Sequence, residues 1–360
     1  MASWPIKVAL QEDESLSCWL SRAALENGCD PLVLTGNVWP KWRVWTTDID
    51  RGIPASKQGA LILASGLDVN SIKQAALSLD ATLFSSHPLP LHGVWPWVLG
   101  LGARNRSYKG GVQFCPCCLA DDLKPYFRRH WRFSWVTGCL LHRVRLVDRC
   151  FQCHKPVEPH RLEAVNTTVL CICSSCGFDF RYSVTEQALI DAMSFQSQAF
   201  RAVSKEAVAV ADQLWPPNQW FHTCRHLVMI IRRSTYFPDS AMSRALADTG
   251  LDIRGFPSES LHLKLELLPV ETREKLLACL YKLLSNIEIF ARNLKLQRVQ
   301  ANSLMGRNHS LPPSLILLTE QLECRNRELV QPRKKAQVKP KSKASVLKAW
   351  ARLKRKYRVE

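Results

Sequence analysis

Hydrophobic residues recur at helical spacing along most of the chain. Residues 12–27 begin with acids, and Ser15 is placed to cap a helix that Gly28 ends. The apolar face of this helix comprises Leu16, Trp19, Leu20, Ala23 and Ala24. Two later faces comprise Trp220, Cys224, Leu227, Val228 and Ile231, and Leu276, Leu277, Leu280, Leu283 and Leu284. Such faces are typical of helices packed on a core, so the sequence predicts a mainly α fold.

Residues 55–79 contain two shorter helical patterns joined at Gly66, which is the arrangement of a helix-turn-helix. The second pattern, residues 69–79, would be the recognition helix, and Lys73 is its one cation. Ile62 is bulkier than the small residue usual at its position. A helix-turn-helix shape is therefore predicted, and both DNA contact and simple packing stay open as its role.

Eight metal-ligand candidates lie between Phe114 and Phe180 in two sets of four. The first set reads C-x2-C-x20-C-x2-H and comprises Cys115, Cys118, Cys139 and His142. The second reads C-x2-C-x19-C-x2-C and comprises Cys150, Cys153, Cys173 and Cys176. Two such pairs close a tetrahedron around one zinc ion and leave no position for substrate. The sequence predicts two structural Zn²⁺ ions in two small zinc-ribbon-like β units, with Cys117 and Cys171 as alternative ligands.

Basic and aromatic residues surround the first set of ligands. Arg104, Arg106 and Lys109 precede it, and Arg128, Arg129 and Arg132 alternate with aromatic residues inside it. These cations are candidates for contact with phosphate or an acidic partner. The alternative for residues 126–135 is a strand with an aromatic inner face and a charged outer face.

Much of the formal net charge of +18 is concentrated near the C-terminus. From Pro332 onward the chain holds twelve Lys or Arg and one acid, which accounts for eleven of the eighteen net positive charges. The candidate contacts there are Arg333, Lys334, Lys335, Arg352, Lys354, Arg355, Lys356 and Arg358. This tail either stays solvated or orders on nucleic acid or in a partner's groove.

Several classes of protein are disfavoured. We find no nucleotide-binding loop, no G-x-S-x-G elbow and no cluster of acids suited to a nuclease. His222 and His226 lie one helical turn apart but lack the glutamate of an H-E-x-x-H motif. No apolar run suits a membrane span, and fourteen cysteines suit a reducing compartment. We expect a binding protein with no catalytic residues in the cytoplasm of a bacterium, associated with the nucleoid.

The expected organisation is multidomain. An N-terminal helical domain covers residues 1–110, the tandem zinc units cover 111–182 and a helical C-terminal domain covers 183–331, opened by a capping box at Ser183 and Glu186. A basic tail, partly disordered or helical, covers 332–360.

The cysteine-rich residues resemble those of the TniQ family, which includes the TnsD-like target selectors of transposons. The resemblance rests on FCPCCLADDLKPYFRRHWR from Phe114, VTGCLLHRVRLVDRC ending at Cys150, CSSCGFDF, and DESLSCWL with Asn27 and Gly28. It implies a non-enzymatic adaptor of a mobile genetic element that selects target sites for DNA transposition. The family's zinc ligands fall on the eight positions given above.

The resemblance also implies partners: DNA or a DNA-targeting CRISPR-type complex, a AAA+ ATPase regulator, the transposase complex and a second copy of the chain. The rival hypothesis is a zinc-dependent DNA-binding transcriptional regulator, based on residues 55–79. An enzyme with an unusual zinc nuclease site is a third alternative.

Overall fold

The computed structural model divides into two compact units, Met1–Glu323 and Cys324–Glu360. Unit 1 is mainly helical, and the one sheet among its described residues has two strands. The backbone is described for residues 3–85, 88–89, 93–101, 111–204, 207–210, 213–254, 256, 263–305, 311–316, 318, 322 and 342–357, and the side chains for the same residues except 352–357. Among the described helices, none combines the length and apolarity needed to cross a membrane.

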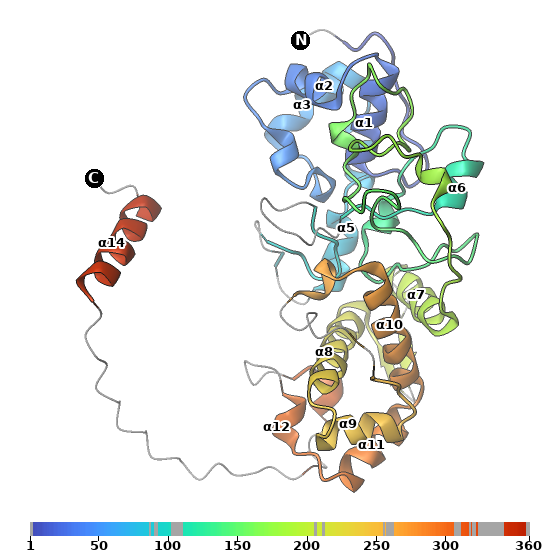
Figure 1. Cartoon of the computed structure of the whole chain (residues 1–360), viewed down its shortest axis with the longest axis vertical. Coiled ribbons are helices and arrows are strands. Elements are labelled where there is room, and N and C mark those ends of the chain that lie inside the picture. The colour runs from blue at the N-terminus through green and yellow to red at the C-terminus, as the bar shows by residue number, and fades with distance from the viewer. Residues whose placement is uncertain are drawn as a thin grey trace. The chain divides into compact units, whose positions relative to one another are not determined.

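The N-terminal part of unit 1 is a group of short helices (Figure 1). They are α1 (Leu16–Glu26), α2 (Pro31–Val38), α3 (Ala55–Ser65), α4 (Val69–Gln74) and α5 (Ser78–Ala81), with 3₁₀ turns at Val44–Thr46, Ile49–Arg51 and Thr82–Phe84. The prediction for α1 is confirmed, because Ser15 accepts a hydrogen bond from the Cys18 amide and Gly28 follows with a φ of 69°.

The turn at Gly66 is also present, with a φ of 79° between α3 and α4. The second helix is shorter than predicted, since α4 ends at Gln74 and a turn separates it from α5. Asp68 caps α4 by accepting hydrogen bonds from the amides of Asn70 and Ser71 at 2.7 and 3.0 Å. The prediction of a single recognition helix over residues 69–79 is therefore wrong, because two short helices occupy this stretch.

The middle of unit 1 is built from turns around the cysteine-rich residues. Its regular elements are α6 (Pro116–Asp121) and the 3₁₀ turns η4 (Arg129–Arg132), η5 (Pro159–Arg161) and η6 (Phe180–Tyr182). All residues from 111 to 182 are described, and they form isolated antiparallel bridges and no regular strand. The expected zinc-ribbon-like β units are therefore reduced to single bridges. The strand expected over residues 126–135 is replaced by η4, although its aromatic residues Phe127, Trp131, Phe133 and Trp135 are buried as expected.

Where the C-terminal part of unit 1 is described, its regular elements are helices and one hairpin. Its helices are α7 (Ile190–Val203), α8 (Pro217–Tyr236), α9 (Ala241–Asp248), α10 (Val270–Ser285), α11 (Ile287–Leu296) and α12 (Ala301–Leu304), with 3₁₀ turns at Leu265–Leu267 and Pro313–Leu315. Strands β1 (Val208–Val210) and β2 (Gln213–Trp215) pair antiparallel, with Val208 opposite Trp215. The two apolar faces predicted for α8 and α10 are buried, which confirms them.

The capping box predicted at Ser183 and Glu186 does not start a helix, because α7 begins at Ile190. Instead, the Glu186 carbonyl accepts a hydrogen bond from the Arg145 amide at 2.7 Å, and Gln187 bridges to Val144. Pairing with the cysteine-rich segment thus keeps this stretch extended.

The described side chains of unit 1 form two hydrophobic cores. A small core holds N-terminal residues from Trp4 to Ala76. The larger core runs from Cys18 to Leu322, so that side chains of the cysteine-rich segment share it with α7, α8 and α10. The metal-ligand candidates consequently sit where the N-terminal and C-terminal helices meet a common core. Unit 2 holds one described helix, α14 (Lys343–Tyr357) (Figure 1).

Candidate metal centres and the contacts around them

The structure brings the eight predicted ligands into two clusters. In each cluster the ligand atoms all lie within 4.8 Å of one another, close enough to hold one metal ion. In the first cluster, His142 Nδ1 lies 3.3–3.5 Å from the sulfurs of Cys115, Cys118 and Cys139. Three thiols and an imidazole converging at such distances are a donor set that suits a tetrahedral zinc ion.

The second cluster holds four thiols. Cys150 Sγ lies 3.6 Å from Cys176 Sγ, and Cys153 Sγ lies 3.7 Å from Cys173 Sγ. Cys150 and Cys173 are buried, whereas Cys176 is exposed. A Cys₄ set also fits zinc, and neither cluster leaves a ligand position open once four protein donors are engaged.

Three of the four ligand pairs lie in tight turns of one kind. In each turn the residue after the second ligand has a positive φ, and its amide donates a hydrogen bond to the carbonyl of the first ligand. These residues are Arg143 (φ 59°), His154 (φ 56°) and Gly177 (φ 75°). A second bond, from the amide of the first ligand to a carbonyl five residues on, closes each turn at 2.8–2.9 Å. The left-handed residue turns the chain back so that both ligands of the pair face the same point.

The remaining pair, Cys115 and Cys118, is positioned by α6 instead. Cys115 is the N-cap residue, Pro116 starts the helix, and the Cys118 amide points at Cys115 Sγ at 3.5 Å. The His142 amide points at Cys139 Sγ at the same distance. Amide donors of this type stabilise the thiolates that a metal requires.

Hydrogen bonding within the first cluster favours a thiolate. The thiols of Cys115 and Cys118 donate to Cys139 and lower its pKa far below the ordinary value, although burial opposes the shift. Beyond the two sets, Cys171 is buried, and burial raises the pKa of its thiol to about 11. Cys171 and Cys117 belong to neither cluster of the described residues. The arrangement thus favours the x2 spacing over the two alternative ligands.

Asp121 supports the first cluster in a way that spacing alone does not reveal. Its carboxylate lies 2.8 Å from His142 Nε2, the ring nitrogen that faces away from the thiols. A carboxylate on the outer nitrogen of a ligand histidine fixes the tautomer and orients the ring. This role was not predicted from the sequence. The signal available there was an acid at the end of α6, the short helix that begins at the ligand Cys115.

Helices α7 and α10 contact the residues on either side of the turn from Cys139 to His142. Gln196 of α7 accepts hydrogen bonds from the amides of Thr137 and Gly138 and donates one to the Gly138 carbonyl at 2.9 Å. A Cβ on Gly138 would lie 2.3 Å from Met193 Sδ, so only glycine fits this close approach. On the other side of the turn, Arg145 pairs with buried Glu274 of α10 at 3.3 Å.

Buried Arg273 provides a further tie to α10. Its guanidinium donates to the Ser134 carbonyl and to Gln113 Oε1, both at 2.7 Å, and to the Leu268 carbonyl at 3.1 Å. Burial lowers its pKa to about 10. Gln113 in turn donates to the Val136 carbonyl at 2.6 Å, so one charged side chain connects three chain segments.

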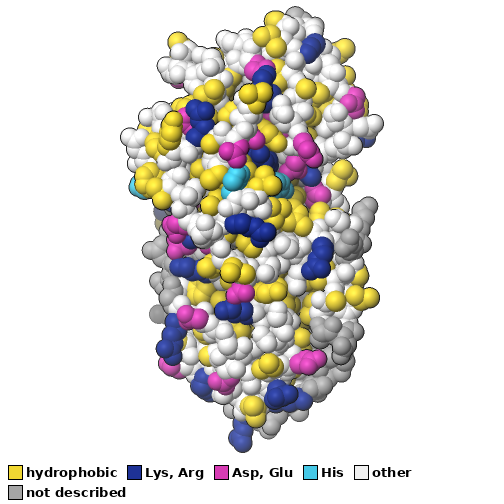
Figure 2. All heavy atoms as spheres, turned by 90° about the vertical axis from the view of Figure 1, so that its right-hand side faces the viewer, with side chains coloured by type: hydrophobic (Ala, Val, Ile, Leu, Met, Phe, Trp, Pro, Cys, Tyr) yellow, Lys and Arg dark blue, Asp and Glu magenta, His cyan; other side chains and the backbone are white. Residues whose placement is uncertain are grey.

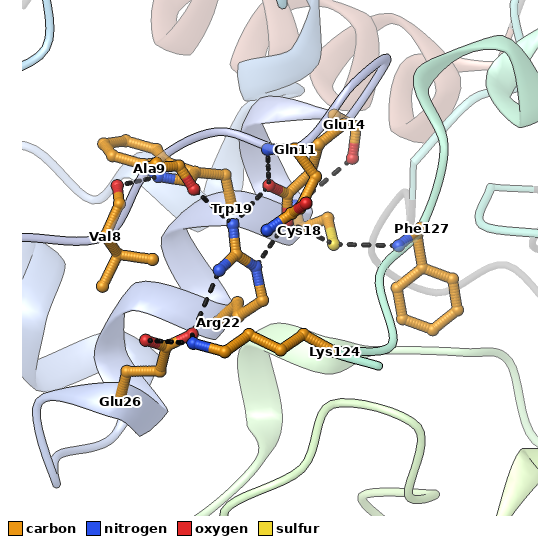
Figure 3. A network of polar contacts seen from close by, with 11 residues as sticks. Val8, Ala9, Gln11, Glu14, Cys18, Trp19, Arg22, Glu26, Lys124 and Phe127 are labelled. Carbon is orange, nitrogen blue, oxygen red and sulfur yellow. Dashed lines mark hydrogen bonds and ion pairs between the residues drawn. The ribbon is translucent and has the colours of Figure 1, made fainter. Parts of the chain in front are cut away.

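The N-terminal helix is joined to the segment that follows α6 by the network in Figure 3. Arg22 of α1 donates to both oxygens of buried Glu14, at 2.9 and 2.6 Å. Cys18 lies 3.2 Å from Glu14 and accepts a hydrogen bond from the Phe127 amide at 3.0 Å. Lys124 lies 3.4 Å from Glu26 at the edge of this network. Since Lys124 and Phe127 follow α6 directly, these contacts hold α1 against the segment that carries the first ligands.

The three arginines inside the first set of ligands meet acids of the same chain. Arg128 pairs with Asp122 at 2.8 Å, and Arg129 contacts Asp13 at 3.1 Å. The arginine network is completed by the contacts of Arg129 with Asp80 and of Arg132 with Asp48 and Asp50. The Arg132 side chain is 2% exposed, which leaves no access for a phosphate. Acidic and basic side chains are also interspersed on the face shown in Figure 2.

For the other predicted contact residues, the structure describes either no atoms or the backbone alone. Arg104, Arg106, Lys109, Arg333, Lys334, Lys335 and Arg358 lie outside the described residues. Arg352, Lys354, Arg355 and Lys356 lie in α14, and their side chains are outside the described part.

His222 and His226 lie on α8, where His226 Nε2 contacts the Leu304 carbonyl at 2.6 Å. Neither histidine belongs to a metal cluster of the described residues.

The fold and the clusters define a class: a mainly helical protein organised around two Cys/His sites that could hold metal ions. Residues 5–146 match the model of the TniQ family. The match confirms the resemblance noted in the sequence, and residues 5–146 form a TniQ domain. A search among curated proteins found no match to the chain. The matched residues include the first cluster, and the second follows directly.

The matched residues carry a functional implication. A TniQ domain implies a role associated with target selection in transposition.

Proposed function

We propose that this chain is a non-enzymatic adaptor that selects target sites for DNA transposition and links them to the transposition machinery. The observation that carries the proposal is the coincidence of the TniQ match with a complete Cys₃His cluster built into the core. Closed four-ligand sites offer no open metal position for hydrolysis, which supports a binding role over a nuclease.

Both clusters hold Zn²⁺ in this proposal, as structural ions. Zinc bound to such sites contributes on the order of 10–16 kcal/mol of apparent free energy near neutral pH. The first site would fix the chain around Cys139 and His142, which Gln196 of α7 and Glu274 of α10 contact through Gly138 and Arg145. It would also fix the segment that follows α6, where the Phe127 amide donates a hydrogen bond to Cys18 of α1. Zinc would thereby serve as a rigid hub for helices at both ends of unit 1.

Nucleic acid is one partner of this adaptor, in the cytoplasm at the nucleoid. The support is the positive charge from Pro332 onward, since phosphate contacts by Lys and Arg supply sequence-independent affinity. We expect a chain lacking residues 332–360 to bind all duplex sequences more weakly, with a flatter dependence of log K on log salt. Loss of specificity with an unchanged salt slope would contradict this role for the tail.

The protein partners we propose are a AAA+ ATPase regulator and, through it, the transposase complex. Target choice is made either on DNA directly or on a CRISPR-type effector complex. The test is a pull-down at low salt with the ATPase encoded beside this chain, using metal-loaded and chelator-treated protein in parallel. Association that requires the loaded protein supports the proposal, and no association under these conditions contradicts it.

A second candidate function is a zinc-dependent transcriptional regulator. The α3 and α4 pair joined at Gly66 is the observation in its favour, because a helix pair of this kind can enter a major groove. The neighbouring genes separate the two candidates, since a regulator has no need to lie beside a transposase.

A further inference from the structure

Helix α14 exposes an apolar edge on an otherwise basic segment. Val346, Leu347 and Trp350 are 52%, 57% and 58% exposed. The helix starts with an ordinary cap, in which Ser342 accepts hydrogen bonds from the amides of Ser345 and Val346 at 3.3 and 3.0 Å. Solvent exposure of a tryptophan and two branched aliphatic side chains on one helix is typical of a surface that binds a partner.

The spacing along α14 indicates the kind of partner. Val346 and Trp350 are four residues apart, and the sequence continues this edge at Leu353 and Tyr357 with steps of three and four. Alternating steps of four and three place residues on the narrow seam by which one helix packs along another. A helix lying on a membrane has a broader apolar face, and contact with DNA phosphates requires no apolar seam.

Charge then selects among possible helices. Every charged residue from Pro332 to Val359 is Lys or Arg, and Lys354 and Lys356 occupy positions beside the seam. Like charges beside a seam repel, so pairing of two α14 helices is disfavoured. An acidic amphipathic helix satisfies both the seam and the charge.

We propose that α14 is a docking helix that packs its seam of Val346 and Trp350 along an acidic amphipathic helix of a partner protein. The interaction is independent of the target-selection role, because it uses unit 2 alone. It gives the basic tail a specific contact in addition to its general attraction to polyanions.

The test uses the full zinc-loaded chain and a synthetic heptad peptide with Ile and Leu at its seam positions and Glu beside them. The seam variant is V346S/W350S, which leaves the charge of the helix unchanged, and the matched variant K348E/R352E reverses cations on the same helix. An unchanged circular dichroism spectrum and metal content establish that unit 1 is intact. Fluorescence anisotropy then measures binding of the labelled peptide and of a duplex DNA.

We expect the peptide to bind the wild-type chain and to lose about tenfold or more in affinity for the seam variant. Duplex affinity should stay within about twofold in the seam variant and fall in K348E/R352E. Equal peptide binding by wild type and seam variant would overturn the proposal. A parallel loss of DNA affinity in the seam variant would make the seam a nucleic-acid contact.

Two further measurements address the remaining occupants. A dimer of the wild-type chain in gel filtration that the seam variant abolishes would assign the seam to a second copy. Tight binding of anionic phospholipid vesicles, lost in the seam variant, would assign it to a membrane. Strong protection of α14 from hydrogen exchange in the free chain would show that unit 1 covers it. Each of these results would overturn the proposal.

Discussion

His142 contacts the first thiol cluster with one ring nitrogen and Asp121 with the other. Nδ1 lies 3.3 Å from Cys118 Sγ, and Nε2 lies 2.8 Å from Asp121 Oδ2. When the ring is neutral, Asp121 therefore accepts the proton of Nε2 in a hydrogen bond and leaves the lone pair of Nδ1 directed at the cluster. A residue outside the predicted ligand set thus prepares the one nitrogen donor for metal.

Replacing Asp121 with Ala should weaken metal binding at the first centre alone. Loss of an outer carboxylate typically costs about 10- to 100-fold in metal affinity, and the low end is expected because the Asp121 side chain is 70% exposed. Competition with a chromogenic chelator should show faster release of one metal equivalent and unchanged release of the other. Asp248→Ala, which removes a carboxylate bonded to Gln297, is the matched control. Equal release rates in wild type and D121A would contradict the role of Asp121.

Gly138 should tolerate no side chain while Met193 is present. A Cβ there would lie 2.3 Å from Met193 Sδ and 2.9 Å from Ala188 Cβ, so Gly138→Ala should cost about 1–3 kcal/mol in stability. Adding Met193→Ala should recover part of this loss in urea unfolding. Gly36→Ala in α2 is the control, since nothing lies within 4 Å of the added Cβ, and it should stabilise by about 0.5–1 kcal/mol. Equal effects at both glycines would argue against the close approach.

Arg132 should matter for stability and not for DNA affinity. Its guanidinium is buried with Asp48 and Asp50, and Asp50 also accepts a hydrogen bond from the Ser17 hydroxyl at 2.8 Å. Arg132→Ala leaves these carboxylates without their cation and should cost about 3–5 kcal/mol. Exposed Arg201→Ala on α7 should stay within about 0.5 kcal/mol. A stable R132A chain whose salt slope for DNA binding falls by about one would instead make Arg132 a phosphate contact.

His226 should make the chain less stable as the pH falls. Burial lowers its pKa, nearby His222 and Arg233 add to the shift, and the hydrogen bond to the Leu304 carbonyl opposes it. The unfolded chain then binds the proton more readily, so stability is lost as pH falls through the ordinary histidine value of about 6.5.

The comparison with His226→Gln isolates this effect, because glutamine retains a donor for the Leu304 carbonyl. Between about pH 7.5 and pH 5.5, the wild-type chain should lose stability relative to H226Q. The loss should be up to about 1.4 kcal/mol for each pH unit below the pKa of this histidine in the unfolded chain. Metal release affects both chains and cancels in the difference. An identical pH dependence of the two chains would contradict the shift.

Local features of the fold could be predicted from the sequence. The C-x2-C and C-x2-H spacings predicted which eight side chains gather into two clusters that could hold metal ions, because each pair is closed by bonds within a few residues. The helix at Ser15 and the buried face of α10 follow equally from local capping and periodicity. In these cases the physical cause lies within one turn or one helix.

Features that depend on distant partners could not be predicted. Arg132 looked like a phosphate contact because Asp48 and Asp50 lie more than eighty residues away in sequence. The helix expected from Ser183 is displaced to Ile190 because Glu186 pairs with Arg145 across the cysteine-rich segment. Positive φ at Arg143 and His154 also escaped prediction, since glycine marks only the third of these turns, at Gly177.

The most direct test of the account is the ratio of metal to protein in the purified chain, measured by inductively coupled plasma mass spectrometry. We expect about two zinc ions per chain, falling to about one in Cys139→Ser and in Cys173→Ser and staying at about two in Cys117→Ser and Cys171→Ser. A wild-type chain with far less than two equivalents, or one whose ratio falls in C117S or C171S and not in the ligand variants, would contradict it.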